Sequence, residues 1–242
     1  MAPILKVNLL TKCFAGLTAL KDVSVDVHEG QICGLIGPNG AGKTTLFSII
    51  AGSLRPTSGT VSFQGTDLTA LKSFQAVQAG VVRTHQITRP FRSMTACENV
   101  EVATHFGRGR ATRNARRTAL EFLEWVGLGH AADRPAALLG VGDQKRLELA
   151  RTLATQPKLL LCDEVCGGLT EIEMNSVLQL LRRIRERGTT IIYVEHNLRA
   201  IMSVCDHVVV LNCGQKLAEG SPRVIQDDPS VVEAYIGKAN VA

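Results

Sequence analysis

The chain has 242 residues, of which 45% are hydrophobic and 20% charged, and its formal net charge is +5 at pH 7. These values are ordinary for a soluble globular protein, and the length suits one large α/β domain or two small ones. The modest positive charge fits nucleotide binding or apposition to an anionic membrane surface and does not demand nucleic acid. No apolar stretch approaches the roughly 20 residues of a membrane span, and Met1–Lys6 lacks a signal-peptide layout. We therefore expect the chain to stay in the cytoplasm.

Strand-like and helical segments alternate along the chain. Strands are expected at Leu5–Leu10, Val23–Val27, Gln31–Ile36, Thr60–Phe63, Val81–Thr84, Lys158–Cys162, Thr190–Val194, His207–Leu211 and near Lys216–Ala218. Helices are expected at Gly42–Ala51, Ser73–Ala79, Glu98–His105, Thr112–Val126, Asp143–Gln156, Glu171–Arg187, Leu198–Val204 and Ser230–Ile236. The alternation in the second half indicates a parallel sheet covered by helices. The first third is richer in strands and turns, which suggests an antiparallel layer.

The block between about Thr88 and Thr155 has a helical pattern without strands and is too long for a loop. It is predicted to be an inserted helical subdomain. A run of arginines lies in this block: Arg108, Arg110, Arg113, Arg116 and Arg117. We favour a solvated face for this run over contact with lipid head groups or a partner.

The segment Gly37–Thr45 reads GPNGAGKTT and matches the phosphate-binding pattern G-x-x-x-x-G-K-[ST] in full. It lies between the apolar run Gln31–Ile36 and a predicted helix, a context that argues against a chance match. Its glycines let backbone N–H groups point at phosphate oxygens, and the helix start adds the positive end of its dipole. Lys43 supplies a charge for the β- and γ-phosphates, and the Thr44 hydroxyl suits Mg²⁺. The expected ATP contacts are Gly37, Pro38, Asn39, Gly40, Ala41, Gly42, Lys43, Thr44 and Thr45.

A second motif is the apolar run Leu159–Cys162 that ends in Asp163 and Glu164. Two carboxylates after a buried strand are costly unless they face a cation. Asp163 is expected to hold Mg²⁺, and Glu164 to orient and polarise the attacking water. The competing interpretation is a strand that ends in a polar turn. The flanking Cys162 and Cys166 are not expected to bind a metal, because no second cysteine pair or histidine cluster completes a site.

The segment Leu139–Arg151 resembles the signature of ATP-binding cassettes, usually LSGGQ followed by a basic amphipathic helix. Gly140 stands where serine is usual, and Asp143 stands where glutamine is usual. Gly140 and Gly142 permit close backbone approach, and the helix that follows points its N-terminus at an anion. On these motifs the chain is identified as a member of the ATP-binding cassette (ABC) family.

The resemblance assigns roles to further residues. Gln86 is similar to the family's glutamine that senses Mg²⁺ and water, and His196 to its switch histidine that contacts the γ-phosphate. Phe14 is similar to the aromatic residue that stacks on adenine. The competing interpretations are a structural histidine at a strand end and an aromatic core residue. Val165 replaces the usual proline and Thr170 the usual aspartate, although Thr170 with Glu173 also forms a capping-box pattern.

The fold that the resemblance implies is α/β, a P-loop NTPase (RecA-like) core with a mostly parallel sheet, an N-terminal antiparallel β layer and an inserted α-helical subdomain. It implies one ABC ATPase domain over 1–242. Residues 1–87 and 156–242 would form the nucleotide-binding core, and 88–155 the helical subdomain that carries the signature.

Two segments, Val81–Val100 and Val231–Gly237, are similar to the branched-chain amino acid importer type of this family. The resemblance implies an ATP-hydrolysing subunit on the cytoplasmic face of the inner membrane, coupled to membrane permease subunits and indirectly to a periplasmic substrate-binding protein, with no direct nucleic acid. It implies a homo- or heterodimer in which Gly140, Gly142 and Asp143 of one chain contact ATP on the other. The region Gln86–Met94 is the expected docking surface for the permease.

Two alternatives stay open. A soluble ABC ATPase of nucleic acid repair or translation would usually carry two cassettes or a long coiled-coil insertion, and this chain shows one cassette and no heptad array. A catalytically impaired regulatory cassette is suggested by the departures at Gly140, Val165 and Thr170.

Overall fold

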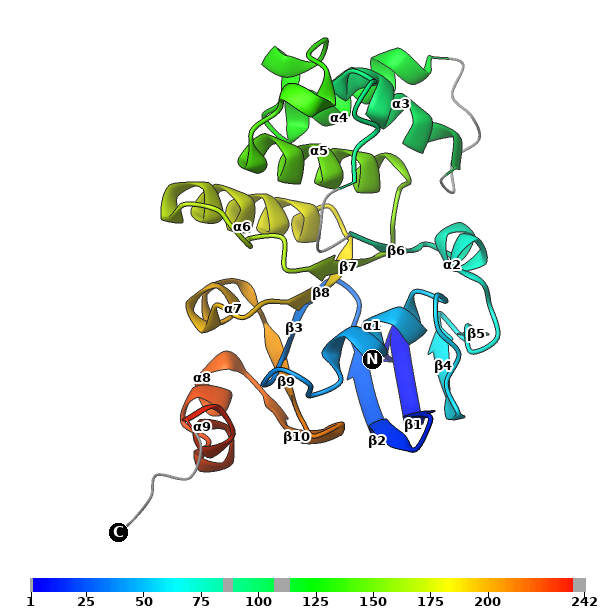
Figure 1. Ribbon diagram of the computed structural model, residues 1–242, viewed down its shortest axis with the longest axis vertical. Helices are drawn as coiled ribbons and strands as arrows, with labels where there is room; N and C mark the ends of the chain where they lie inside the picture. The colour runs from blue at the N-terminus through cyan, green and yellow to red at the C-terminus, as the bar shows by residue number, and fades with distance from the viewer. Residues whose placement is uncertain (1, 85–88, 107–113, 237–242) are drawn as a thin grey trace. The chain divides into compact units, whose positions relative to one another are not determined.

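The computed structural model describes residues 2–84, 89–106 and 114–236 (Figure 1). The chain divides into two compact units, unit one with residues 1–75 and 190–242, and unit two with residues 76–189. Helix α2 (Ser73–Ala79) spans the first crossing between them. No helix among the described residues combines the length and apolar character that a membrane span requires.

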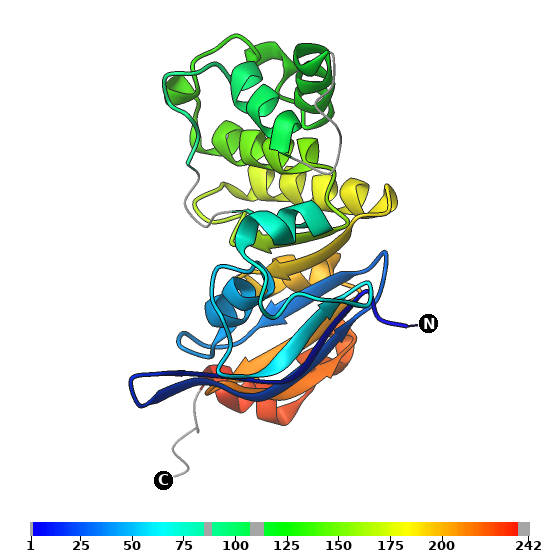
Figure 2. The same ribbon diagram turned by 90° about the vertical axis from the view of Figure 1, so that its right-hand side faces the viewer.

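Unit one contains an antiparallel sheet near the N-terminus. Its strands, in spatial order, are β2 (Leu17–Val27), β1 (Leu5–Phe14), β4 (Ser58–Phe63) and β5 (Thr66–Asp67). The turn between β1 and β2 consists of Ala15 and Gly16, with φ values of 40° and 94°, as a tight two-residue hairpin requires. Figure 2 shows this long hairpin in dark blue. The predicted antiparallel layer is confirmed, and both strands extend beyond their predicted ends to meet at this turn.

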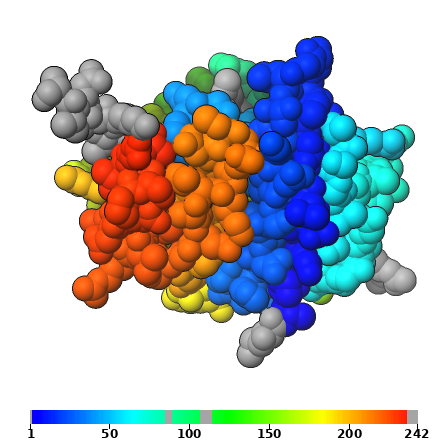
Figure 3. Space-filling model, turned by 90° about the horizontal axis from the view of Figure 1, so that it is seen from below, coloured from blue at the N-terminus to red at the C-terminus, as the bar shows by residue number. Residues whose placement is uncertain are grey.

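Unit one also contains parallel strands. Strand β3 (Ile32–Ile36) pairs in parallel with β8 (Thr190–Val194) and β9 (His207–Asn212), and β10 (Gln215–Gly220) returns antiparallel to β9. Every residue of β3 and β8 is buried, so both strands form the core of this unit. The helices of the unit are α1 (Lys43–Ile50), α7 (Leu198–Val204), α8 (Pro222–Gln226) and α9 (Pro229–Ile236). Seen from below, the C-terminal helices, β9–β10, the β1–β2 hairpin and β4 follow one another across the face (Figure 3).

Unit two combines a strand pair with helices. Strands β6 (Val81–Arg83) and β7 (Leu159–Asp163) pair in parallel. The helices are α3 (Ala96–Phe106), α4 (Ala115–Trp125), α5 (Val141–Ala154) and α6 (Glu171–Glu186), with short 3-10 turns η1 (Gly129–Ala131) and η2 (Ala136–Leu138). Helices α3, α4 and α5 pack against one another, as the green part of Figure 1 shows. Within the described part of 89–155 no strand is present, as predicted.

The boundaries of the predicted subdomains stay a prediction. The helical block predicted at 88–155 lies in unit two, together with β6, β7 and α6. Helix α8 was not expected from the sequence pattern. It is short, and it begins at Ser221, whose side chain accepts a hydrogen bond from the backbone of Val224, with Pro222 in its first turn, where proline is tolerated.

Candidate functional site

The phosphate-loop segment connects β3 to α1 in unit one. The Nζ of Lys43 is buried and donates to the backbone carbonyls of Gly37, at 2.6 Å, and Pro38, at 2.9 Å. The ammonium group therefore lies inside the curl of the loop, held by the loop's own carbonyls. A phosphate oxygen would compete with these two carbonyls for the same donors.

Two glycines of this loop are required by its geometry. Gly37 has a φ of 149°, and a Cβ there would collide with the carbonyl oxygen of Leu211. Gly42 has a φ of 101°, and a Cβ there would lie 2.6 Å from Cδ2 of Leu20. Gly42 is also the N-cap of α1 and has no side chain with which to cap it. The start of α1 thus carries no side-chain cap, as suits a helix start that binds an anion.

Phe14 lies at the end of β1, directly before the hairpin turn, and is 43% exposed. The Nζ of Lys12 lies 4.9 Å from its ring centroid. The ring is therefore a surface aromatic with an accessible face and does not belong to the buried core.

His196 follows β8 and is exposed. Because β3 and β8 are parallel neighbours, with Leu35 opposite Val194, the loop at Gly37 and His196 leave the same edge of the sheet. Asn197 then caps α7 by accepting a hydrogen bond from the N–H of Ala200 at 3.2 Å. Unit one thus brings the predicted phosphate loop and the predicted switch histidine to one edge.

Asp163 ends β7 in unit two and is buried. Its Oδ2 accepts a hydrogen bond from Nη2 of Arg83 at 2.6 Å, and its backbone N–H donates to the Thr84 hydroxyl at 3.0 Å. Arg83 ends the neighbouring strand β6, so its guanidinium compensates the buried carboxylate. The sequence motif did not indicate this partner. The parallel pairing of two strands that end in opposite charges is the signal that could have found it.

Glu164 directly follows Asp163 and is half-buried. Its φ of 48° lies in the left-handed region, which is strained for a residue with a side chain. Its backbone carbonyl accepts hydrogen bonds from Nζ of Lys145, at 3.2 Å, and from the N–H of Gly167, at 3.1 Å. The buried Lys145 of α5 therefore helps to hold the turn that carries the predicted catalytic carboxylate.

The predicted signature segment forms the start of α5. Gly140 is the N-cap and offers no capping side chain, Val141 is 56% exposed, and Asp143 lies in the first turn. A Cβ at Gly142 would lie 2.6 Å from Oε1 of Glu173. Gly142 therefore has a structural role as well, because it admits the carboxylate that caps α6.

Helix α6 begins with the predicted capping box, which is confirmed. The backbone N–H and the hydroxyl of Thr170 donate to Oε2 of Glu173 at 2.9 and 2.7 Å, and the N–H of Glu173 donates back to the Thr170 hydroxyl at 3.4 Å. These bonds lower the pKa of the Glu173 carboxyl below its ordinary value. Val165, the other departure from the family pattern, is buried.

Some of the predicted residues lie outside the described part of the chain, and two of the arginines form surface ion pairs. Gln86 and the arginines at 108, 110 and 113 fall outside the described residues. Arg116 pairs with Asp133 at 2.8 Å and Arg117 with Glu121 at 3.1 Å, both on the surface. Burial raises the pKa of the Cys162 thiol, and the described residues contain no cluster of histidines, cysteines and carboxylates that could hold a metal.

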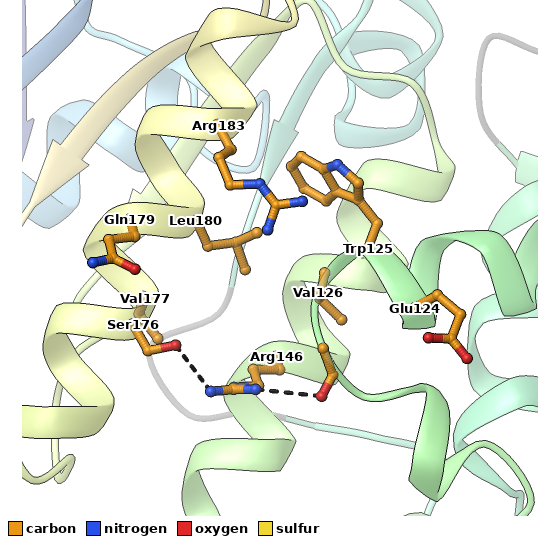
Figure 4. A pocket seen from close by; sticks show the side chains of 10 residues that line it. Glu124, Trp125, Val126, Arg146, Ser176, Val177, Gln179, Leu180 and Arg183 are labelled. Carbon is orange, nitrogen blue, oxygen red and sulfur yellow. Dashed lines mark hydrogen bonds between the residues drawn. The ribbon is translucent and has the colours of Figure 1, made fainter.

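A pocket of about 200 Å³ lies between α4, α5 and α6 in unit two (Figure 4). Arg146 crosses it and donates to the carbonyl of Gly127 at 3.3 Å and to the Ser176 hydroxyl at 2.9 Å. Arg183 lies over the Trp125 ring at 4.8 Å from its centroid. Both arginines join helices of unit two, and none of the predicted site residues lines this pocket.

Comparisons with known proteins agree with the motifs. The family model described as ABC transporter matches residues 20–167, and the model described as branched-chain amino acid ATP-binding cassette transporter matches residues 215–240. The chain is 40% identical to the high-affinity branched-chain amino acid transport ATP-binding protein BraF of Pseudomonas aeruginosa, with 98% of this chain and 99% of the relative covered. It is equally similar to the corresponding protein LivG of Salmonella typhimurium, with the same coverage.

A solved structure, the ADP conformation of an ATP-binding cassette of an ABC transporter, superimposes with a TM-score of 0.88 at 31% identity. The superposition covers 98% of this chain and 100% of that one.

Proposed function

The chain belongs to the ABC transporter family of ATPases, and on this premise we propose that it is the ATP-hydrolysing subunit of an importer for branched-chain or related amino acids. Its α/β fold is that of a P-loop NTPase. The observation that carries the proposal is the loop from Gly37 to Lys43, where glycine backbone, a buried lysine and the open start of α1 converge. The relatives that align over 98% of the chain are named as amino acid transport proteins, which favours an importer over a soluble ABC ATPase.

ATP binding uses the backbone of unit one. Lys43 would exchange its bonds to the Gly37 and Pro38 carbonyls for the β- and γ-phosphates. The first N–H groups of α1 would donate to phosphate oxygens with the helix dipole behind them. Phe14, exposed beside the hairpin turn, would stack on the adenine.

Mg²⁺ fits the residues present. The exposed Thr44 hydroxyl and the Asp163 carboxylate are the hard oxygen ligands that this ion prefers. When bound, the ion would neutralise charge on the phosphates, and Gln86 would be a further ligand.

Hydrolysis would depend on two residues, Glu164 and His196. Glu164 would orient the attacking water and accept its proton, and His196 would contact the γ-phosphate. The transition state of phosphoryl transfer is loose, so positioning and charge neutralisation supply most of the catalysis. The hydrogen bonds that fix the Glu164 turn through Lys145 and Gly167 serve that positioning.

The partners follow from the family. A second cassette, identical or related, would present Gly140, Gly142 and Asp143 to ATP bound by the first. Membrane permease subunits would form the path and hold the chain at the cytoplasmic face of the inner membrane. A periplasmic binding protein would select the amino acid.

The proposal is tested in a strain from which the gene has been deleted. Uptake of radiolabelled leucine, isoleucine and valine is expected to fall, and to return with the wild-type gene but not with Lys43→Ala. Lysine uptake serves as the control for general damage to transport. Undiminished branched-chain uptake in the deletion strain would overturn the proposed substrate class, and absence of ATP hydrolysis by the purified chain with its permease would overturn the enzymatic part.

A further inference from the structure

A buried hydroxyl and a buried carboxylate lie within hydrogen-bond distance just before His196, the hydroxyl in strand β8 and the carboxylate directly after the strand. Tyr193 is fully buried at the end of β8, and Glu195, two residues on, is 6% exposed. The Tyr193 hydroxyl donates to Oε2 of Glu195 at 3.2 Å.

The second oxygen of this carboxylate reaches the backbone. Oε1 of Glu195 accepts a hydrogen bond from the N–H of His196 at 3.1 Å. The peptide that joins the two residues is therefore tied to a side chain that is itself anchored by the buried Tyr193.

The backbone is fixed on the other side of His196 as well. Asn197 caps α7 through the N–H of Ala200, and its carbonyl accepts from the N–H of Ile201 at 3.2 Å. His196 is thus an exposed side chain held between two anchored neighbours. A buried carboxylate is costly to desolvate unless hydrogen bonds compensate it, and here the compensating donors come from Tyr193 and from the backbone of His196 itself.

We propose that Glu195 and Tyr193 are positioning residues that fix the backbone at His196 and so hold its imidazole ready for the phosphates bound at the neighbouring loop. The inference rests on the proposed function, because it assigns Glu195 an effect through His196 on ATP hydrolysis. A positioning role for Glu195 differs from a purely structural role in one respect: without the imidazole of His196, the Glu195 carboxylate has nothing to position.

The test measures kcat and KM for ATP in the full chain with its permease. Glu195→Ala is expected to lower kcat by about 10- to 100-fold, the usual cost of a small misplacement of a reacting group, with KM nearly unchanged. Glu195→Gln is expected to retain most of the activity, because its amide oxygen still accepts the His196 N–H. Glu29→Ala, which removes an exposed carboxylate of the same unit, is the matched control and is expected to leave both constants unchanged.

The deciding measurement is made in the His196→Ala background. If Glu195 acts through the imidazole, Glu195→Ala with His196→Ala is expected to equal His196→Ala alone. A further loss in the double variant, by the same factor as in the wild-type background, would show a general structural role and overturn the inference. Wild-type kcat for Glu195→Ala would also overturn it.

Folding of each variant is checked by circular dichroism and thermal melting. If Glu195→Ala does not fold, Tyr193→Phe takes its place, because it removes only the anchoring hydroxyl and is expected to lower kcat in the presence of His196 but not in its absence. Equal activity of Tyr193→Phe and the wild type would then overturn the inference. Failure of the wild type to hydrolyse ATP would instead refute the proposed function, and wild-type activity of His196→Ala would refute the role of His196 and its positioning while leaving the ATPase function intact.

Discussion

In two passages of this protein a buried strand continues through a loop into a helix, and the two passages differ in how that helix begins. Between β3 and α1, the backbone is the proposed binding surface, and the helix starts at a glycine that supplies no side-chain cap. Between β7 and α6, side chains carry the proposed chemistry, and the helix start is closed by the capping box of Thr170 and Glu173.

The difference follows from the charged group in each passage, which is a bound anion in the first proposal and a pair of carboxylates in the second. An anion is bound well by open N–H groups at a helix start, so a cap there would compete with the ligand. A passage that presents carboxylates has no such need, and its helix start is closed by its own side chains. The same local topology is therefore proposed to serve a backbone site in unit one and a side-chain site in unit two.

The strongest test of the side-chain passage is Glu164→Gln. Turnover of ATP is expected to fall by about 10²- to 10⁴-fold, the contribution typical of a general base, while ATP affinity is retained. Steady-state hydrolysis and equilibrium binding of a fluorescent ATP analogue measure the two effects. Glu171→Gln, an exposed carboxylate in the first turn of α6, is the control, and near-normal hydrolysis by Glu164→Gln would contradict the assignment.

The corresponding test of the backbone passage is Lys43→Ala. Loss of a charge-assisted hydrogen bond costs about 1.5–3 kcal/mol, so ATP affinity is expected to fall by about 10- to 100-fold. Titration with the fluorescent analogue checks this, with Lys6→Ala on the exposed side of β1 as the control. If ATP binds Lys43→Ala as tightly as it binds the wild type, the phosphate-loop interpretation is wrong.

Gly42→Ala tests whether the open helix start depends on glycine. A side chain at a φ of 101° would be strained and would collide with Leu20 and the Ala19 carbonyl, so the free energy of unfolding is expected to fall by about 1–3 kcal/mol. Gly140→Ala is the matched control, because that N-cap has ordinary φ and open space around its Cα. Chemical denaturation measures both, and equal stability of the two variants would argue against the strain.

Thr170→Ala opens the closed helix start. Loss of an N-cap of this kind costs about 0.5–2 kcal/mol, which in a chain of this size lowers Tm by roughly 2–4 °C per kcal/mol. ATP affinity is expected to be unchanged, because the phosphate loop lies in the other passage. Differential scanning fluorimetry checks the first expectation, and an unaltered Tm would mean that the capping bonds contribute nothing measurable.

The smallest expected effect is the acid sensitivity of the same cap. The bonds from Thr170 lower the pKa of the Glu173 carboxyl, so the stability that this group contributes is present above the ordinary carboxyl pKa of about 4.3. It is lost as the pH falls through the lower pKa of the folded state. The stability of the wild type is therefore expected to approach that of Thr170→Ala as the pH falls below about 4, and a constant difference between the two from pH 7 to 3 would contradict this linkage.

The residues whose roles could be predicted share a local cause. The glycines, Lys43 and Thr44 stand in a fixed pattern because a phosphate loop requires positive φ values at set positions. The box of Thr170 and Glu173 is equally local, because its two members are three residues apart on one helix turn. The carboxylate pair at Asp163 and Glu164 was recognisable because it ends an apolar strand.

The partners that hold these groups could not be read from the sequence. Arg83 lies 80 residues before its partner Asp163, and Lys145 reaches the Glu164 carbonyl from helix α5. Gly142 was assigned to ligand approach, and the structure adds that it admits the Glu173 carboxylate. The link from Tyr193 to Glu195 spans only two residues, yet a buried carboxylate beside a tyrosine has no recognisable motif.

The sequence by itself therefore determined the ligand class and most of the element order, and it indicated the helix start that is proposed to bind an anion, because each depends on local residue patterns. Tertiary structure alone decided which cation compensates Asp163, what fixes the turn at Glu164 and how the backbone at His196 is anchored. The contacts of Arg83 with Asp163 and of Lys145 with Glu164 form only when elements distant in the chain pack together. The bonds at His196 are local in sequence, and they become necessary because packing buries Tyr193 and Glu195.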